Sequence, residues 1–413
     1  MKSFLQPIFF LFLFSVVLFS CDNFDDVPAN GSNDIYLVSH EKVSTHSLVE
    51  INILVAFASI QFPDLAAIGD KFVSPVDVYK ISYYTTFEGE KRKASGLVCV
   101  PSNAGTYPLM SFQNGTNTLH SAAPSVAPDS DLFQLLGMMA SSGFVIAIPD
   151  YLGFGVADDM FHPYLDKEST VQTVLDMLRA TKEMVEKLES TELNEDLYIT
   201  GYSQGGWSTM QVQKAIESNY SGEFNLVASA CGAGPYDLVG ISNYVFGQTT
   251  YPMPYFLGYL INSYSNLGMT TPIDSMFKEP YASRIPGLFD GSKDGAEINT
   301  ELTKVVGDLF TTSFLDNWES GPVYSSFYSM LQDNSISGYK TKVPTLLIHG
   351  SADTFVPSFT SQNLYNEFIT QGVNSSLLYY IELPGLDHQD AVVPAELQAI
   401  KWFLQIKEGE ITF

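Results

Sequence analysis

The sequence predicts an α/β fold in which a mostly parallel central sheet, flanked by helices, carries a mainly helical cap insertion. Short apolar runs alternate with helix-compatible stretches along much of the chain, which is the pattern of parallel strands joined by crossover helices. The alternation stops at about residue 236 and resumes near residue 341. We therefore expect one α/β core built from residues 35–235 and 341–413, with a cap at residues 236–340.

The expected elements follow from changes of hydrophobic period along the chain. Apolar side chains recur at helical spacing over residues 45–69, which predicts a helix there. After Pro75 the period changes to that of strands, and the polar run Glu88–Lys91 between two of them predicts a β-hairpin. Further strands are expected at residues 109–112, 144–148, 196–200 and 226–230, and helices at residues 131–141, 168–189 and 207–217.

The residues Gly201-Tyr-Ser-Gln-Gly205 form a GxSxG pattern between a strand-like run and a helix-compatible stretch. In a strand-to-helix turn of this kind the serine hydroxyl is exposed for attack. Glycines flank it because strand and helix pack too closely there for side chains. The pattern predicts Ser203 as a nucleophile, which needs a base because a free hydroxyl is a weak nucleophile at neutral pH.

The base and the acid are expected in two loops after the cap. His388 follows the strand-like residues 376–381 and lies in a glycine-bearing loop before the terminal helix. Asp353 follows the apolar run 345–348 and precedes a helix that begins at Pro357. An acid holds the imidazole in the correct tautomer, so Asp353 and His388 complete the order Ser, Asp, His.

The other histidines are expected to have structural roles. His349 lies in the turn that bears Asp353, and we expect it to shape that turn. His120 and His162 are expected near the mouth of the site, where a hydrogen-bonded structural role is favoured over catalysis.

Two backbone N–H groups are needed to stabilise the oxyanion that forms when a serine attacks a carbonyl. One should come from Gln204, directly after the nucleophile, and the other from the loop after an earlier strand. In that loop Gly115 would let the backbone turn toward the substrate, and Thr116 is the preferred donor. The alternative is that this loop is a tight turn without a catalytic role. No HExxH or CxxC motif occurs, so neither a metal nor another cofactor is expected.

The N-terminus predicts export. An apolar run from Ile8 to Phe19 follows Lys2, and it is too short to span a bilayer, which needs about 20 apolar residues. Residues 1–20 are therefore expected to be a signal peptide. The segment Leu18-Phe-Ser-Cys21 resembles a bacterial lipobox, so Cys21 would be acylated and residues 21–34 would form a tether. We expect an outer-membrane or cell-surface lipoprotein of a Gram-negative bacterium; a plain secretory signal, giving a periplasmic or secreted protein, is the alternative.

The composition excludes one class of partner. The 413 residues include 46 acidic and 20 basic side chains, which give a formal charge of −26. Phosphate binding needs clustered Lys and Arg, so nucleic acid is not an expected partner. Cys99 and Cys231 lie in apolar, strand-like runs, which favours buried free thiols over a disulfide.

Several segments carry signals typical of one family: Ser111–Thr116, Pro149–Gly155, His162–Tyr164, Gly201–Gly206, Gly350–Asp353 and Asp387-His388. Together they resemble the α/β-hydrolase superfamily, and within it the secretory-lipase type and its bacterial lipoprotein relatives. The resemblance implies a serine hydrolase of the lipase or esterase type that cleaves carboxylic esters, with a lipid or other small-molecule acyl ester as substrate. It would work through an acyl-enzyme, with Ser203 as nucleophile, Asp353 as acid and His388 as base. It also implies that Asp150-Tyr151 and His162–Tyr164 shape the entrance to the site.

Two other functions and the substrate remain open at this stage. A serine peptidase is one alternative, because some α/β-hydrolases cleave peptides, although no propeller repeat is visible. A non-catalytic, surface-binding lipoprotein is the other, and the complete set of three catalytic residue types argues against it. Apolar cap residues either line an acyl pocket or form the core of the cap itself: Tyr251, Met253, Tyr255, Phe256, Tyr259, Leu260 and Ile261.

Overall fold

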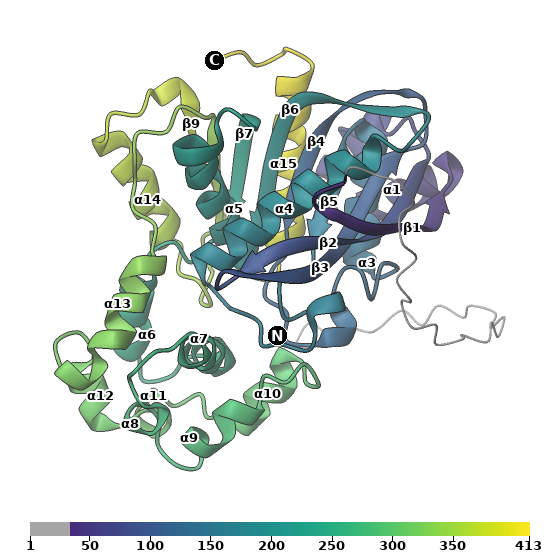
Figure 1. The fold of residues 1–413 in the computed structure, drawn as a ribbon. Helices are drawn as coiled ribbons and strands as arrows, with labels where there is room; N and C mark the ends of the chain where they lie inside the picture. Colours follow the sequence, from purple (N-terminus) through teal and green to yellow (C-terminus); the bar gives the residue numbers. More distant parts are fainter. Residues whose placement is uncertain (1–33) are drawn as a thin grey trace. The chain divides into compact units, whose positions relative to one another are not determined.

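A nine-stranded sheet runs through residues 34–413, the part of the chain that the computed structural model describes (Figure 1). Its strands are β1 (Leu37–His46), β2 (Val76–Phe87), β3 (Glu90–Pro101), β4 (Gly105–Gln113), β5 (Val145–Pro149), β6 (Thr191–Tyr202), β7 (Asn225–Gly232), β8 (Thr345–Gly350) and β9 (Leu378–Leu383). They lie in the order β1-β2-β3-β5-β4-β6-β7-β8-β9. The pairs β1-β2, β2-β3 and β3-β5 are antiparallel, and the pairs β5-β4, β4-β6, β6-β7, β7-β8 and β8-β9 are parallel. The predicted mostly parallel sheet is confirmed.

Helices cover both faces of the sheet. One face packs against α1 (Leu48–Gln61), α3 (Asp131–Met139) and α15 (Val392–Lys407). The other face packs against α4 (Lys167–Val185), α5 (Gln204–Ala215) and α14 (Phe359–Thr370). Successive side chains of a strand point to opposite faces, so the buried strands are apolar on both sides. In β8, for example, Leu346 and Ile348 pack on the first face and Leu347 on the second.

The N-terminal prediction is wrong at its start. Residues 45 and 46 belong to β1, an edge strand that the sequence analysis did not predict, and the helix α1 begins only at Leu48. The boundary is set by Ser47, whose hydroxyl accepts from the Glu50 N–H while the Glu50 carboxylate accepts from the Ser47 N–H. After α1 the chain forms the short helix α2 (Pro63–Ala66). Because β1 is polar and largely exposed, it lacks the apolar alternation that reveals a buried strand.

The interval assigned to the cap contains helices and no strand of the central sheet. In the sequence these helices come between β7 and β8, and they pack around a hydrophobic core made mostly of their own residues (Figure 1). They are α6 (Leu238–Phe246), α7 (Pro254–Asn266), α8 (Ile273–Met276), α9 (Tyr281–Arg284), α10 (Gly295–Glu301), α11 (Val306–Leu309), α12 (Thr312–Asn317) and α13 (Ser325–Asn334).

The turn from β6 to α5 is packed against the backbone of both neighbouring strands. A side chain at Gly201 or Gly205 would clash with the carbonyl oxygen of Gln113 in β4, and one at Gly206 would clash with Gly232 in β7. The glycines of the GxSxG pattern are thus required by close backbone contact, which is the physical reason given for them from sequence.

This contact makes Gly205→Ala destabilising, although alanine ordinarily favours a helix over glycine. We expect the substitution to lower the free energy of unfolding by about 2 kcal/mol or more, the size of an overpacking defect. Gly222→Ala is the matched control, because a methyl group there would meet no atom within 4 Å. Urea denaturation of both variants tests the prediction, and equal midpoints for the two would contradict it.

Candidate active site

Ser203 occupies a strained turn between β6 and α5. Its backbone has φ 60° and ψ −121°, a left-handed region that residues with side chains rarely adopt. The turn is held by a hydrogen bond from the Ser203 N–H to the carbonyl of Gly232, 2.9 Å long. The hydroxyl is directed to His388, and its Oγ lies 2.8 Å from His388 Nε2.

His388 is fixed between Ser203 and Asp353. Its Nδ1 lies 2.5 Å from Asp353 Oδ2, while the rings of Tyr202 and Phe355 pack against the imidazole at centroid distances of 5.2 and 5.5 Å. Because Nδ1 must donate to the carboxylate, Nε2 is left as the acceptor for the Ser203 hydroxyl. The structure therefore brings together the three predicted residues from loops that follow β6, β8 and β9.

Asp353 is held as a carboxylate by its own turn. Its Oδ1 accepts from the N–H groups of Phe355 and Val356, each at 2.9 Å. Burial by itself would raise the pKa of Asp353, but hydrogen bonds from His349 and His388 outweigh it and lower the pKa to about 2. Hence Asp353 is charged throughout the neutral range.

His349 lies in the turn that bears Asp353, as expected. Its Nε2 is 2.8 Å from the Val356 carbonyl and 3.2 Å from Asp353 Oδ2. Its Nδ1 is 2.7 Å from Ser361 Oγ, which can donate to it. With both ring nitrogens engaged, His349 braces the turn and does not approach Ser203.

The residues predicted to form the oxyanion site lie on two sides of Ser203. Gly115 and Thr116 line the same cavity as the serine, and Gln204 is the first residue of α5. The backbone N–H groups of Thr116 and Gln204 have no backbone or side-chain acceptor within residues 34–413. The positive end of the α5 dipole also points at this position, which favours a developing negative charge.

The side chain of Gln204 has a partner that the sequence analysis did not identify. Gln204 Nε2 lies 2.9 Å from Nε2 of the buried His162, and His162 Nδ1 lies 2.7 Å from the Leu152 carbonyl. Since Nδ1 donates to that carbonyl, Nε2 accepts from the Gln204 amide, and the histidine is neutral. Burial lowers the pKa of His162 to about 4, against a weaker opposing effect of the Leu152 carbonyl.

The segments expected at the entrance lie behind the cavity wall instead. Asp150 is buried and accepts from the hydroxyl of Ser95 at 2.5 Å and the N–H of Ser125 at 2.8 Å. Tyr164 is also buried, and its hydroxyl lies 3.0 Å from Thr116 Oγ1. Neither these residues nor His162 and Tyr151 line the cavity. Tyr164 contacts Thr116 and His162 contacts Gln204, so these two residues support the proposed oxyanion segments. A motif alone does not distinguish such a role from a place at the entrance.

The cavity at Ser203 has a volume of about 590 Å³ and extends between the core and the cap. Met253, Tyr255 and Phe256 of the cap line it, whereas Tyr259, Leu260 and Ile261 belong to the buried cap core. Tyr251 bonds through its hydroxyl to the Phe355 carbonyl at 2.9 Å. Aromatic and methionine side chains form much of the wall: Phe112, Phe133, Met253, Tyr255, Phe256 and Phe355.

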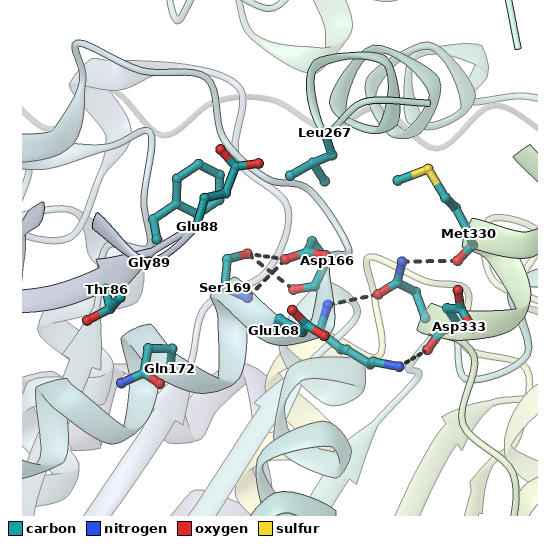
Figure 2. Close-up of a pocket in the computed structure, with 13 residues that line it drawn as sticks. Thr86, Glu88, Gly89, Asp166, Glu168, Ser169, Gln172, Leu267, Met330 and Asp333 are labelled. Carbon is teal, nitrogen blue, oxygen red and sulfur yellow. Dashed lines mark hydrogen bonds between the residues drawn. The ribbon is translucent and has the colours of Figure 1, made fainter. Parts of the chain in front are cut away.

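A second cavity, of about 640 Å³, lies where the β2–β3 hairpin and α4 meet the cap (Figure 2). Several of its polar groups are paired with one another: Ser169 donates to Asp166, and Lys167 donates to the carbonyl of Asp333 and the side chain of Asn334. Ser203 and His388 are absent from its lining. We therefore assign this cavity to the junction of cap and core, although it is slightly larger than the one at Ser203.

Other features of residues 34–413 bear on the remaining expectations. Cys99 and Cys231 are buried free thiols, as predicted. No His, Cys, Asp and Glu side chains of the described chain gather into a group that could hold a metal ion. None of its helices has the length and apolar character needed to cross a membrane.

Comparison with known proteins identifies relatives of this architecture. The secretory lipase family model matches residues 119–411. Lipase 6 of Candida albicans is 22% identical over 340 residues, an alignment that covers 73% of this chain and 66% of the relative, so the chain spans just under two thirds of that protein.

Solved structures are similar over nearly the whole described chain. A protein of Legionella pneumophila has a TM-score of 0.80 at 25% identity, covering 92% of this chain and 100% of its own. The rice cell wall degrading esterase LipA of Xanthomonas oryzae, in a ligand-bound form, has a TM-score of 0.75 at 25% identity. The match covers 88% of this chain and 96% of the LipA chain. The predicted α/β-hydrolase fold is confirmed.

The buried, neutral His162 predicts a loss of stability in acid. Between about pH 6.5 and pH 4 the unfolded chain binds a proton at this histidine and the folded chain does not, so stability falls as the pH falls. His162→Gln should remove up to about 3 kcal/mol of that loss, while His46→Gln, which changes a less buried histidine, should leave it. Urea unfolding at pH 7 and pH 4.5 measures the difference. An equal loss in His162→Gln and wild type would contradict the assignment.

Proposed function

Because the chain belongs to the secretory lipase family, we propose that it is a carboxylic ester hydrolase that works through an acyl-enzyme on Ser203. The observation that carries the proposal is the hydrogen-bonded chain from Ser203 Oγ to His388 Nε2 and from His388 Nδ1 to Asp353. These three hydrogen-bonded residues lie at the N-terminus of α5, beside an apolar cavity. Such an arrangement supports nucleophilic attack on an uncharged carbonyl.

In the proposed reaction His388 Nε2 takes the proton of the Ser203 hydroxyl as Oγ bonds to the ester carbonyl carbon. The carbonyl oxygen becomes an oxyanion, for which the free N–H groups of Thr116 and Gln204 are the donors. When the carbonyl reforms, the alcohol leaves with the proton from His388. A water molecule, deprotonated by His388, then attacks the acyl carbon. The bond between that carbon and Oγ breaks, the carboxylic acid is released, and Ser203 Oγ takes the proton back from His388. Asp353 keeps its charge throughout and stabilises the imidazolium.

The proposed substrate is an ester with an apolar acyl group. Apolar side chains form most of the cavity wall, and the cap contributes Met253, Tyr255 and Phe256 to it. Each methylene buried there would add up to about 0.8 kcal/mol of binding. An enzyme of this kind should cleave p-nitrophenyl esters and not aminoacyl anilides, which distinguishes it from a serine peptidase.

We further propose that the protein is exported and anchored by lipid at Cys21. The family is described as secretory, which agrees with export. The signal peptide at residues 1–20, Cys21 and most of the tether at residues 21–34 lie outside the described residues. Their assignment depends on the apolar run and the lipobox-like Leu18–Cys21 alone.

Substitution of the three hydrogen-bonded residues tests the mechanism. Ser203→Ala and His388→Ala should each lower kcat for p-nitrophenyl butyrate by roughly 10⁴- to 10⁶-fold, because the residues act as a unit. Asp353→Asn should have a somewhat smaller effect. His46→Gln is the control, because His46 lies in β1 and does not line the cavity at Ser203. A Ser203→Ala protein that retains more than about 1% of wild-type kcat would sink the proposed role, because loss of the nucleophile removes the whole unit.

The cap wall predicts the preferred acyl length. Esters of medium chain length should have a higher kcat/KM than acetate esters, and Phe256→Ala should lower kcat/KM for the octanoate ester by about tenfold, since a lost aromatic contact is worth more than 1 kcal/mol. The acetate ester should respond much less. Tyr328→Ala alters a cap aromatic outside the cavity and should leave the profile unchanged. A strong preference for acetate in both variants would mean that the cavity wall does not select the acyl chain.

A further inference from the structure

The helix α1 has apolar side chains on two opposite faces. Ile51 and Val55 are buried and pack in the core that α1 shares with α3 and α15. The opposite face is exposed, with relative accessibilities of 68% for Val49, 50% for Ile53, 64% for Phe57 and 80% for Ile60. We call these four residues the outer stripe.

The outer stripe is continuous along the helix. Its members are three or four residues apart, so they lie above one another on one side of an α-helix. Glu50 is the only charged residue between Leu48 and Gln61, and its carboxylate is bound to the N-cap residue Ser47. A surface helix normally turns a polar face to water. An apolar face of this length is expected to have a non-aqueous partner.

A second copy of the chain is a poor fit for that partner. The helix has 14 residues, which makes it about 21 Å long and about 10 Å wide. A contact of roughly 200 Å² is far below the approximately 800 Å² that each partner contributes to a standard protein interface. A lipid surface needs no such area, because a helix can lie in the interface with its apolar side chains among the acyl chains.

The chain length limits how far α1 can be from the proposed anchor. Residues 22–33 can span at most about 40 Å when extended. The strand β1, about 33 Å long, separates them from α1, which begins at Leu48. A protein acylated at Cys21 therefore keeps this helix within reach of the bilayer. The formal charge of −26 disfavours an anionic surface, so the fitting partner is a zwitterionic one.

We propose that the outer stripe of α1 inserts into the surface of a zwitterionic phospholipid bilayer. The helices α1, α3 and α15 cover the same face of the sheet, so docking through α1 would turn the face that carries α3 and α15 toward the lipid (Figure 1). The first residues of those two helices, Leu132, Phe133 and Val392, line the cavity at Ser203, and Leu132 is partly exposed. The outer stripe would thus hold the enzyme on the lipid bilayer, in which apolar esters dissolve. The lipid anchor and the ester hydrolase activity are separate proposals on which this one builds.

The test compares vesicle binding of matched variants. Ile53→Gln/Phe57→Gln changes the stripe, and Val323→Gln/Ile369→Gln changes two exposed apolar residues elsewhere. In the full chain carrying Cys21→Ala, partitioning onto phosphatidylcholine vesicles should fall about tenfold or more for the stripe variant only. Hydrolysis of soluble p-nitrophenyl butyrate should be equal in all forms. Absence of that hydrolysis would count against the proposed activity alone and leave the binding result valid.

A second measurement applies if Cys21→Ala prevents maturation. In the acylated protein, a fluorophore on Phe57→Cys should shift to the blue when phosphatidylcholine vesicles are added, and one on Ile369→Cys should not. Equal partitioning or equal spectral shifts at the two sites would overturn the proposal. It would also be overturned if the stripe variant turned a dimer into a monomer in light scattering, or melted well below the control, because the stripe would then pack against protein.

Discussion

The close approach of α5 to the strands on either side of β6 is the constraint on which the site depends. Because glycines allow the backbone of the turn to touch β4 and β7, Ser203 is held at a left-handed φ with its hydroxyl directed to His388. The same contact brings the N-terminus of α5 beside the loop that carries Thr116. One packing constraint therefore sets the position of the proposed nucleophile and of both proposed oxyanion donors.

The cap is tied to the loops that carry this chemistry. The hydroxyl of Tyr259 donates to the Asn117 carbonyl at 3.1 Å, and that of Tyr251 donates to the Phe355 carbonyl at 2.9 Å. Thr118 also donates through its hydroxyl to the Lys293 carbonyl, 2.9 Å away. The cap thus contacts the segment after β4 and the turn that holds Asp353. A displaced cap would change the support of the oxyanion loop as well as the acyl wall.

Features with strong local signals could be located from the sequence. Ser203 in its strained turn, Asp353 after a buried strand and His388 in a loop each combine a reactive residue type with a characteristic position. The structure brings these three residues together. The interaction of His162 with Gln204 could not be predicted, because it joins segments far apart in the chain through side chains with no periodic pattern. The strand β1 was missed for a related reason: as an exposed edge strand it owes its conformation to pairing with β2 rather than to burial.

The most direct test of the account is to trap the covalent intermediate during turnover. The wild-type protein, acid-quenched within the first turnover of p-nitrophenyl butyrate, would be digested and analysed by mass spectrometry. If Ser203 is the nucleophile, the peptide that contains it carries one butyryl group in the wild-type protein and none in the Asp353→Asn/His388→Ala protein. A butyryl group on another residue, or full p-nitrophenol release with no acylated peptide at any time, would contradict the central claim.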